Sequence, residues 1–418
     1  MKVSPILGLI VVTTLVRLAF AATTGLGVDE SYMVTAGRVL SLGYFDHPPA
    51  SWWLSWSAAH LLGTEAPVVV RLPFILLFAL SQFLLWRIGC LIASQSAGLW
   101  AAGLWAAAAL NIAPVFGVTA GSWVLPDGPL DTALLGAALC LLHALPASGR
   151  RATAWWAVAG LCAGLALFAK YSAVLIMGGG LLYLMVTPAH RLWLRRPEPY
   201  LAAAIALLMF SPVLIWNATH GWASFAFQGD RAIGFRLRPL MPIQTLAGEA
   251  LFVLPWFWVP MMIAFVQGFR RGATWPHRLL VWLAAPPIVG FALISTWSTQ
   301  RILYHWAAPG YLMLFPLLGQ AIERRLDQAW VRRGLAASAA LVLAATAVIA
   351  SQVQFDWLGG ALTTVMRADP TAEGLDWTSL ADDLRARGLL PAGTVVAALN
   401  WRDAGKIGYA LGPGATML

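Results

Sequence analysis

Hydrophobic residues recur in runs of membrane-spanning length along most of this 418-residue chain. A helix rises 1.5 Å per residue, so a run of ~20 apolar residues crosses a hydrocarbon layer of ~30 Å. The pattern predicts about eleven spanning helices, although the stretches around Lys170 and Tyr304 can be divided in more than one way. The runs cover residues 4–22, 68–93, 97–115, 130–145, 154–169, 173–186, 200–216, 246–266, 279–294, 304–318 and 335–351.

Composition agrees with this pattern. The chain is 60% hydrophobic, has a mean hydropathy of +0.73 and contains 22 Trp. A water-soluble domain could not cover so much apolar surface, so the sequence predicts an all-α polytopic membrane protein. Its cysteines, Cys90, Cys140 and Cys162, all lie in apolar runs, and we expect them to be core residues rather than disulfide partners or metal ligands.

The first apolar run follows Lys2 and has two interpretations. Small residues at Ala19 and Ala21 resemble the cleavage site of a signal peptide. The run is nevertheless long enough to span a bilayer, which favours a retained first transmembrane helix.

The net charge of +9 comes from cations in short clusters between the apolar runs. Such clusters encode membrane topology, so we expect no nucleic-acid partner. If the N-terminus is cytoplasmic, every second loop of the chain lies on the cytoplasmic side, and these loops hold the clusters. We therefore expect a multi-pass protein of a bacterial-type inner (plasma) membrane. The clusters are Arg150 and Arg151; Arg191, Arg195 and Arg196; Arg270, Arg271 and Arg278; and Arg324, Arg325, Arg332 and Arg333.

The loops on the other side hold most of the remaining ionisable side chains. A random scatter of charges would not be sorted in this way, so the active site is expected on the extracytoplasmic face. The residues concerned are Asp29, Glu30, Arg38, Asp46, His47, Asp127, Lys170, His220, Asp230, Arg231, Arg236, Arg238, Arg301 and His305.

The first of these loops, residues 23–67, is expected to be the first catalytic loop. Apolar and polar residues between positions 29 and 42 alternate as in a short amphipathic helix lying at the membrane interface. Asp29 and Glu30 would begin this helix, where its dipole favours carboxylates whether or not they take part in catalysis. Two prolines follow Asp46 and His47, which therefore belong either to a simple interfacial turn or to a site.

The chain divides at about residue 352. Residues 1–352 form the predicted transmembrane domain, whereas residues 353–418 are more acidic. A helix near 375–387 and a strand near 394–399 predict a small extracytoplasmic α/β segment, which is either abbreviated or completed by a partner.

Several motifs resemble one known family. D-E-x-Y at 29–32 followed by G-Y-F-D-H-P-P at 43–49 is similar to the first extracytoplasmic loop of the GT-C glycosyltransferases related to protein O-mannosyltransferases and the lipid A aminoarabinose transferase. Further motifs follow in the same order over almost the whole chain. They are L-P-D-G-P at 125–129, A-K-Y-S at 169–172, W-N-A-T-H-G-W-A-S-F-A-F-Q at 216–228, H-W-A-A-P at 305–309 and N-W-R-D-A-G-K at 400–406.

This resemblance implies transfer of a sugar from a polyprenyl-phosphate donor to a lipid, glycan or protein acceptor at the membrane. It assigns the general base to Asp29, and Glu30 would orient the acceptor or the sugar. The family's metal-binding acid corresponds to Asp46, whereas His47 replaces a phosphate-contacting Lys. This replacement puts the phosphate-binding role of the position in doubt, because His titrates near neutral pH.

Sugar transfer from a lipid phosphate also has requirements of its own. A base must accept the proton of the acceptor hydroxyl, and cations must stabilise the departing phosphate. Asp127 is predicted to be a second acid of the site, or else a helix cap, and Lys170 to contact phosphate, or else to reach the interface. The predicted substrate-binding residues are Tyr32, Arg38, His47, Lys170, Tyr171, His220, Arg231, Arg236, Arg238, Arg301 and His305.

The cations that follow Trp216 fit a second role as well. They could attract anionic lipid headgroups instead of a substrate phosphate. A divalent ion, which could be zinc, magnesium or manganese, is predicted at Asp46 with His220 as the favoured second ligand and His47 or His305 as alternatives.

Two other function classes fit parts of the pattern. A transporter or flippase of a polyprenyl-linked glycan would also use cations near the membrane, but it predicts polar residues and broken helices at mid-membrane in two related halves. A membrane scaffold or receptor gives no reason for acids, His and Arg to share the same loops. The sequence therefore favours the transferase, with the flippase as the alternative.

Overall fold

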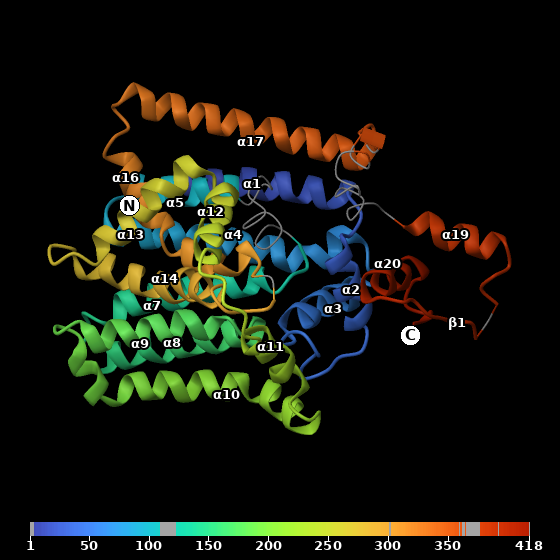
Figure 1. Cartoon of the computed structure of the whole chain (residues 1–418), viewed down its shortest axis with the longest axis horizontal. Coiled ribbons are helices and arrows are strands. Elements are labelled where there is room, and N and C mark those ends of the chain that lie inside the picture. The colour runs from blue at the N-terminus through green and yellow to red at the C-terminus, as the bar shows by residue number, and fades with distance from the viewer. Residues whose placement is uncertain are drawn as a thin grey trace.

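The computed structural model describes residues 4–108, 123–300, 302–358, 360–361, 364, 377–391 and 393–417. Almost all of the regular structure in these ranges is helical (Figure 1). The elements up to residue 233 are α1 (Ser4–Thr23), α2 (Val28–Gly37), α3 (Ala50–Leu62), α4 (Pro67–Ile92), α5 (Gln95–Ala108), α7 (Asp127–Ala144), α8 (Gly149–Ala169), α9 (Ala173–Val186), η1 (Arg191–Arg195), α10 (Pro197–Thr219) and α11 (Ala223–Ile233).

The second half of the chain completes the bundle and adds a small C-terminal segment. It contains α12 (Met241–Val253), α13 (Pro255–Gly268), α14 (Trp275–Ile294), η2 (Tyr304–Ala307), α15 (Ala308–Leu312), α16 (Phe315–Glu323), α17 (Ala329–Phe355), α19 (Thr378–Ala386), β1 (Val395–Val396), α20 (Trp401–Leu411) and β2 (Thr416–Met417). β1 and β2 pair in parallel.

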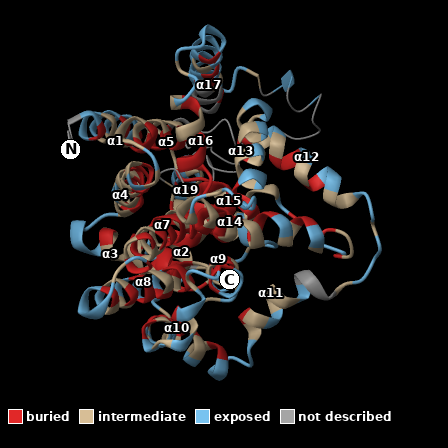
Figure 2. Cartoon of the chain, turned by 90° about the vertical axis from the view of Figure 1, so that its left-hand side faces the viewer, coloured by how far each residue is buried: buried red, intermediate tan, exposed pale blue. Residues whose placement is uncertain are grey.

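The long helices lie side by side, and the short helices α2, α3, α11 and α20 gather at one end of the bundle (Figure 1). Within the described residues, five helices are long and apolar enough to cross a membrane, and a sixth span is possible if the bent pair α12 and α13 counts as one. Leu15, Leu76, Leu208 and Leu343 are among the large apolar side chains exposed on the outside, whereas the buried residues fill the middle (Figure 2). The chain is a multi-pass membrane protein, as predicted.

Small residues let these helices approach closely, as is usual in membranes. A Cβ on Gly160 of α8 would lie 2.4 Å from the carbonyl oxygen of Ala202 on α10, and a Cβ on Gly89 of α4 would lie 2.4 Å from the Cα of Gly98 on α5. No larger residue fits at either contact without moving a backbone.

Two predicted spans are not continuous helices. The run 246–266 breaks at Leu254, where α12 and α13 meet at 117°. Leu254 has a positive φ of 74°, and Pro255 has no N–H with which to continue the preceding helix. The run 304–318 divides into η2, α15 and the start of α16, with Pro309 and Pro316 near the first residue of α15 and of α16. The count of about eleven spans stays a prediction.

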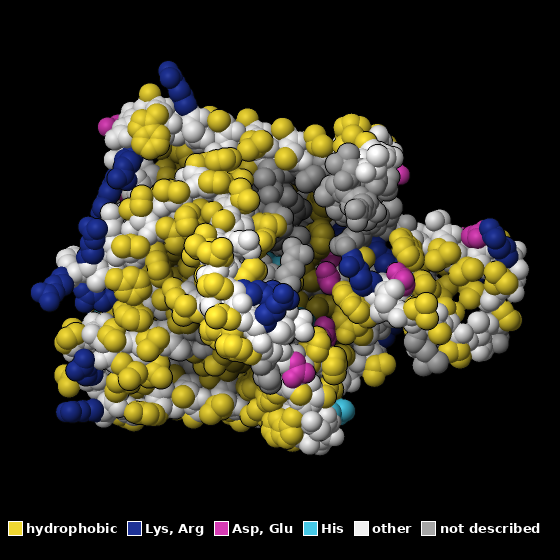
Figure 3. All heavy atoms as spheres, in the orientation of Figure 1, with side chains coloured by type: hydrophobic (Ala, Val, Ile, Leu, Met, Phe, Trp, Pro, Cys, Tyr) yellow, Lys and Arg dark blue, Asp and Glu magenta, His cyan; other side chains and the backbone are white. Residues whose placement is uncertain are grey.

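The two ends of the bundle differ in charge. Lys and Arg side chains line one end, and acidic side chains appear near the other (Figure 3). We call the first the arginine end, defined by the twelve arginines of the four predicted clusters. The other is the site end, defined by α2, α3, α11 and α20.

Local predictions at the site end were partly correct. The interfacial helix predicted over 29–42 is α2, which ends at Gly37, where a Cβ would lie 3.1 Å from the Trp52 side chain of α3. The predicted helix near 375–387 is α19, and the strand predicted over 394–399 is reduced to β1. Neither α3 nor α20 was predicted.

Candidate functional site

The turn before α2 is built around a buried ion pair. The Glu30 carboxylate is fully buried and lies 2.6 Å from Nη2 of Arg71, which comes from the first turns of α4. It also accepts hydrogen bonds from the backbone N–H of Gly27 at 2.9 Å and of Val124 at 3.1 Å. These four donors fix α2 against α4 and against the segment that leads into α7.

Asp29 precedes Glu30 in the same first turn, but it is only half-buried. Consecutive residues on a helix point about 100° apart, so only one of the two acids can face the core. The positive end of the α2 dipole favours a carboxylate at either position. Asp29 is therefore the acid of this pair that a ligand can approach, whereas the predicted contact of Glu30 with a substrate stays a prediction.

The loop after α2 brings Asp46 back onto the same helix. The Tyr32 hydroxyl donates a hydrogen bond to Oδ1 of Asp46 at 3.2 Å, and the side-chain amide of Gln228 on α11 donates to the Asp46 carbonyl. Burial and the neighbouring Asp46 carboxylate both raise the pKa of Tyr32, so its phenol stays protonated and remains a donor. The Tyr44 ring stacks on Trp52 at 4.1 Å, and the two prolines after His47 lead into α3.

Asp127 and Lys170 form a second ion pair at the site end. Nζ of Lys170 lies 2.8 Å from Oδ1 of Asp127, and both side chains are largely buried. Asp127 is the first residue of α7, and Lys170 is directed toward the acid instead of reaching into the interface. Asp131 lies one turn further along α7 and is 2% exposed, and its Oδ1 has no hydrogen-bond partner among the described residues.

Tyr171 links this pair to the Asp46 loop. Its hydroxyl lies 2.7 Å from Oγ of Ser224 on α11, and its ring packs edge-on against Phe225. Burial raises the pKa of Tyr171, and the Asp46 carboxylate adds to the shift, so the two side chains are electrostatic neighbours. Residues from α2, the 38–49 loop, α7, the turn after α8 and α11 thus meet at one end of the bundle.

Arg38 has partners inside the protein. Its Nε and Nη2 donate to the two carboxylate oxygens of Glu65 at 2.9 and 2.6 Å, and its Nη1 donates to the carbonyl of Gly408 at 2.8 Å. The side chain joins the first loop to α20. In this arrangement it holds the loop, and its predicted contact with a substrate is untested.

The other predicted residues lie around this centre. His220 is exposed and stacks on Trp216 at 4.2 Å, whereas His305 lies in η2, beside α12 and α14. The backbone N–H groups of Arg236 and Arg238 donate to the carbonyls of Trp297 and Thr296, respectively. Arg236 is exposed, and Arg238 is half-buried. Arg301 and the side chain of Arg231 lie outside the described residues.

The predicted metal ligands are Asp46 together with His220, His47 or His305. Among the described residues, no group of three or more His, Cys, Asp and Glu side chains could hold a metal ion. Asp46 accepts from Tyr32, and Nδ1 of His220 lies 2.8 Å from the carbonyl oxygen of Trp216. The predicted ion therefore stays a prediction.

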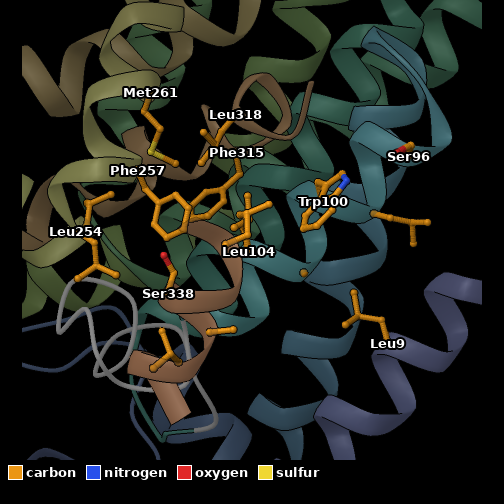
Figure 4. A pocket seen from close by; sticks show the side chains of 16 residues that line it. Leu9, Ser96, Trp100, Leu104, Leu254, Phe257, Met261, Phe315, Leu318 and Ser338 are labelled. Atoms are coloured by element: carbon orange, nitrogen blue, oxygen red, sulfur yellow. The ribbon is translucent and has the colours of Figure 1, made fainter. Parts of the chain in front are cut away.

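An apolar cavity of about 550 Å³ lies inside the bundle (Figure 4). Leu9 of α1, Trp100 of α5, Phe257 of α13 and Val342 of α17 are among the residues that line it. Leu9 precedes the last residue of α1 by fourteen positions, or ~21 Å, so this part of the cavity lining lies inside the membrane-spanning body.

Comparisons with known proteins agree with this architecture. Residues 46–216 match the family model described as dolichyl-phosphate-mannose-protein mannosyltransferase. The structure superimposes on ArnT from Cupriavidus metallidurans bound to undecaprenyl phosphate with a TM-score of 0.71, at 17% identity, covering 99% of this chain and 85% of that one. The chain therefore has the fold of ArnT. The family model that matches residues 46–216 agrees with the resemblance found in the sequence.

Two further similar proteins extend the comparison. The chain is 27% identical over 320 residues to the lipid A galacturonosyltransferase RgtD of Rhizobium johnstonii, and the match covers 74% of this chain and 64% of that relative. It therefore spans less than two thirds of the length of RgtD. The Archaeoglobus fulgidus oligosaccharyltransferase tethered to an acceptor peptide matches with a TM-score of 0.55 at 13% identity, covering 100% of this chain and 64% of that one.

Sequence reasoning missed several residues at the site end of this protein. Arg71 carried a signal, because a charged residue inside an apolar run requires a partner. Asp131 carried the same signal. Nothing in the spacing of Glu65 and Lys406 along the sequence indicated their contacts.

Proposed function

We propose that this chain transfers a sugar from a polyprenyl-phosphate donor to a hydroxyl of a lipid acceptor at the site end of the bundle. The observation that carries the proposal is that the elements bearing Asp29, Asp46, the Asp127–Lys170 pair and Tyr171 gather at one end of an apolar bundle. The names of the matched proteins support the same chemistry: one acts on lipid A, and one is bound to undecaprenyl phosphate. A lipid is therefore preferred to a glycan or protein acceptor.

In the proposed reaction Asp29 accepts the proton of the acceptor hydroxyl. The hydroxyl oxygen then forms a bond to the anomeric carbon while the bond from that carbon to the phosphate oxygen breaks, and polyprenyl phosphate leaves. Asp29 suits this role because it is partly exposed at a helix start, beside the fully buried Glu30. The Glu30–Arg71 pair holds Asp29 in place.

Lys170, Arg236 and Arg238 are the proposed contacts of the donor phosphate. Lys170 is already oriented by Asp127 at 2.8 Å, so its ammonium keeps donors for a second anion. The two arginines lie on a loop whose backbone is held by hydrogen bonds to residues 296 and 297. Cations at these positions would stabilise the charge that develops on the departing phosphate.

The apolar cavity supports a donor with a long hydrocarbon chain, because the cavity lies deep in the body and has few polar groups. We place the protein in a bacterial-type inner membrane with the site end extracytoplasmic and the arginine end cytoplasmic, as the positive-inside rule predicts. The donor would then meet its acceptor at the outer leaflet.

The test is transfer by the purified protein in lipid nanodiscs. Polyprenyl-phosphate carriers of galacturonic acid, aminoarabinose and mannose are each incubated with lipid A, and products are read by mass spectrometry. We expect the mass of one sugar to be added to lipid A with one of these donors, and no product with Asp29→Asn.

Asp230→Asn is the matched control, because Asp230 is an exposed acid at the same end of the molecule. This variant should retain wild-type turnover. Full turnover by Asp29→Asn would remove the base assignment. Absence of product from all donors, together with movement of a labelled polyprenyl lipid across the bilayer, would favour the flippase alternative.

A further inference from the structure

The C-terminal helix α20 packs directly on α2, the helix that carries Asp29 (Figure 1). Gly405 and Gly408 lie three residues apart and so share one face of α20. A Cβ on Gly405 would lie 2.7 Å from the backbone N and Cα of Tyr32, and a Cβ on Gly408 would lie 2.6 Å from Cγ2 of Thr35. The two helices are in contact at their backbones, and only glycine allows this approach.

Hydrogen bonds fix the same contact along its length. The Thr35 hydroxyl donates to the carbonyl of Gly405 at 3.1 Å, and Arg38 donates to the carbonyl of Gly408 at 2.8 Å. The Tyr409 hydroxyl donates to the carbonyl of Glu65 at 2.9 Å. α20 therefore holds both α2 and the segment between α3 and α4.

Lys406 is a cation on the buried face of α20. Its side chain is 3% exposed, and its ammonium donates to the carbonyl of Leu26, just before the first turn of α2. Arg71 donates to the two preceding carbonyls, those of Thr24 at 3.1 Å and of Gly25 at 2.7 Å. Three successive carbonyls of one turn are thus bound by two buried cations from distant parts of the chain.

We infer that Lys406 and α20 position Asp29 for the reaction by fixing the turn from which α2 begins. The inference rests on the proposed function. A buried ammonium loses its hydration, so it remains at this place only while polar atoms such as the Leu26 carbonyl surround it. Lys406 acts through the backbone of residues 24–27 and is a positioning residue, not a group that touches the substrate.

The expected effect follows from how steeply reaction rates depend on geometry. A displacement of ~1 Å in a reacting group can lower the rate about 100-fold. Replacing Lys406 by Met keeps the length and apolar stem of the side chain but removes the hydrogen bond to Leu26. The first turn of α2 then loses one of its two cationic anchors, while the proposed phosphate contacts at Lys170 and Arg236 are unchanged.

The first test compares Lys406→Met, Lys406→Arg and the control Arg402→Met in nanodiscs. Arg402 is an exposed cation on the same helix. We expect Lys406→Met to lower kcat per folded molecule about 10- to 100-fold with an unchanged KM for the donor. Lys406→Arg should recover part of kcat, and Arg402→Met should match the wild type. Wild-type kcat in Lys406→Met, or a loss confined to KM, would overturn the inference.

A second test does not depend on activity. Asp29→Cys is introduced, and the rate at which a water-soluble maleimide labels its thiol is measured with Lys406 and with Lys406→Met, after subtraction of the labelling of the native cysteines. We expect the rate to change several-fold, and an unchanged rate would contradict the positioning role even if no sugar transfer is ever detected.

Glycine variants probe the helix contact separately. Gly405→Ala should displace α20 from Tyr32 and alter labelling at position 29 in the same direction. Gly414→Ala is the matched control, because a Cβ at Gly414 meets no atom within 4 Å. Equal labelling in the two glycine variants would show that the contact between α20 and α2 does not position the first turn.

Discussion

Removing either partner of the Glu30–Arg71 pair should destabilise the fold. The two side chains are 0% and 1% exposed and share hydrogen bonds of 2.8 and 2.6 Å. Breaking a buried ion pair from one side typically costs about 3–5 kcal/mol, because the other charge is left without compensation. In Arg71→Met the Glu30 carboxylate keeps the N–H donors of Gly27 and Val124, so we expect a loss of about 3 kcal/mol.

The measurement is the free energy of unfolding in detergent, followed by tryptophan fluorescence, for Glu30→Gln, Arg71→Met and the double variant. Because the two residues act as a unit, the double variant should be more stable than the sum of the single effects predicts, with a coupling energy on the order of 2 kcal/mol. Arg387→Met is the control. Arg387 and its partner Asp383 are 67% and 51% exposed, and an exposed pair contributes less than about 1 kcal/mol.

The outcome separates two roles of Glu30. If Glu30 mainly contacts substrate, Glu30→Gln will unfold like the wild type and only its turnover will fall. If Glu30 mainly holds the turn before α2, stability and turnover will fall together, and Arg71→Met will reproduce both changes. Independent effects of the two single variants on stability would refute the reasoning from the ion pair.

Three further outcomes are expected. Lys170→Met should raise the KM for the donor about tenfold or more, because a charge-assisted hydrogen bond contributes ~1.5–3 kcal/mol, and an unchanged KM would exclude a phosphate contact. Joint replacement of Arg236 and Arg238 by Ala should weaken donor binding and reduce its salt dependence, which titration at two ionic strengths measures. For the predicted metal, chelation should lower turnover and Asp46→Asn should lower the metal content found by elemental analysis; full turnover in a metal-free preparation would contradict that prediction.

The end of the bundle that holds the site could be predicted from the sequence. Asp29, Asp46, Asp127 and Lys170 belong to loops separated by even numbers of predicted spans, so they must share one end. The structure agrees, because the N–H of Val124, three residues before Asp127, donates to Glu30 beside Asp29. Hydrophobic runs and charge clusters are local signals, and the side of the membrane on which a loop lies depends on little else.

The partners of these residues could not be predicted in the same way. Glu30 pairs with a residue 41 positions away, and Lys406 bonds to a carbonyl 380 positions away. No periodicity links positions at such separations, because the contacts depend on how whole helices pack. The break at Leu254 was missed for a related reason, since the composition of 246–266 is that of a continuous span and only Pro255 indicated a bend.

The adjacent acids Asp29 and Glu30 show how packing assigns different roles to similar residues. Both belong to the same helix start, the same dipole and the same predicted loop. Their directions differ by about 100°, and this rotation alone turns Glu30 toward Arg71 in the core and leaves Asp29 half-buried at the surface. The neighbour of this fixed carboxylate is held at a known position and remains partly exposed. Under the proposed function, the buried acid therefore supplies the rigidity, and Asp29 is the acid that accepts the proton.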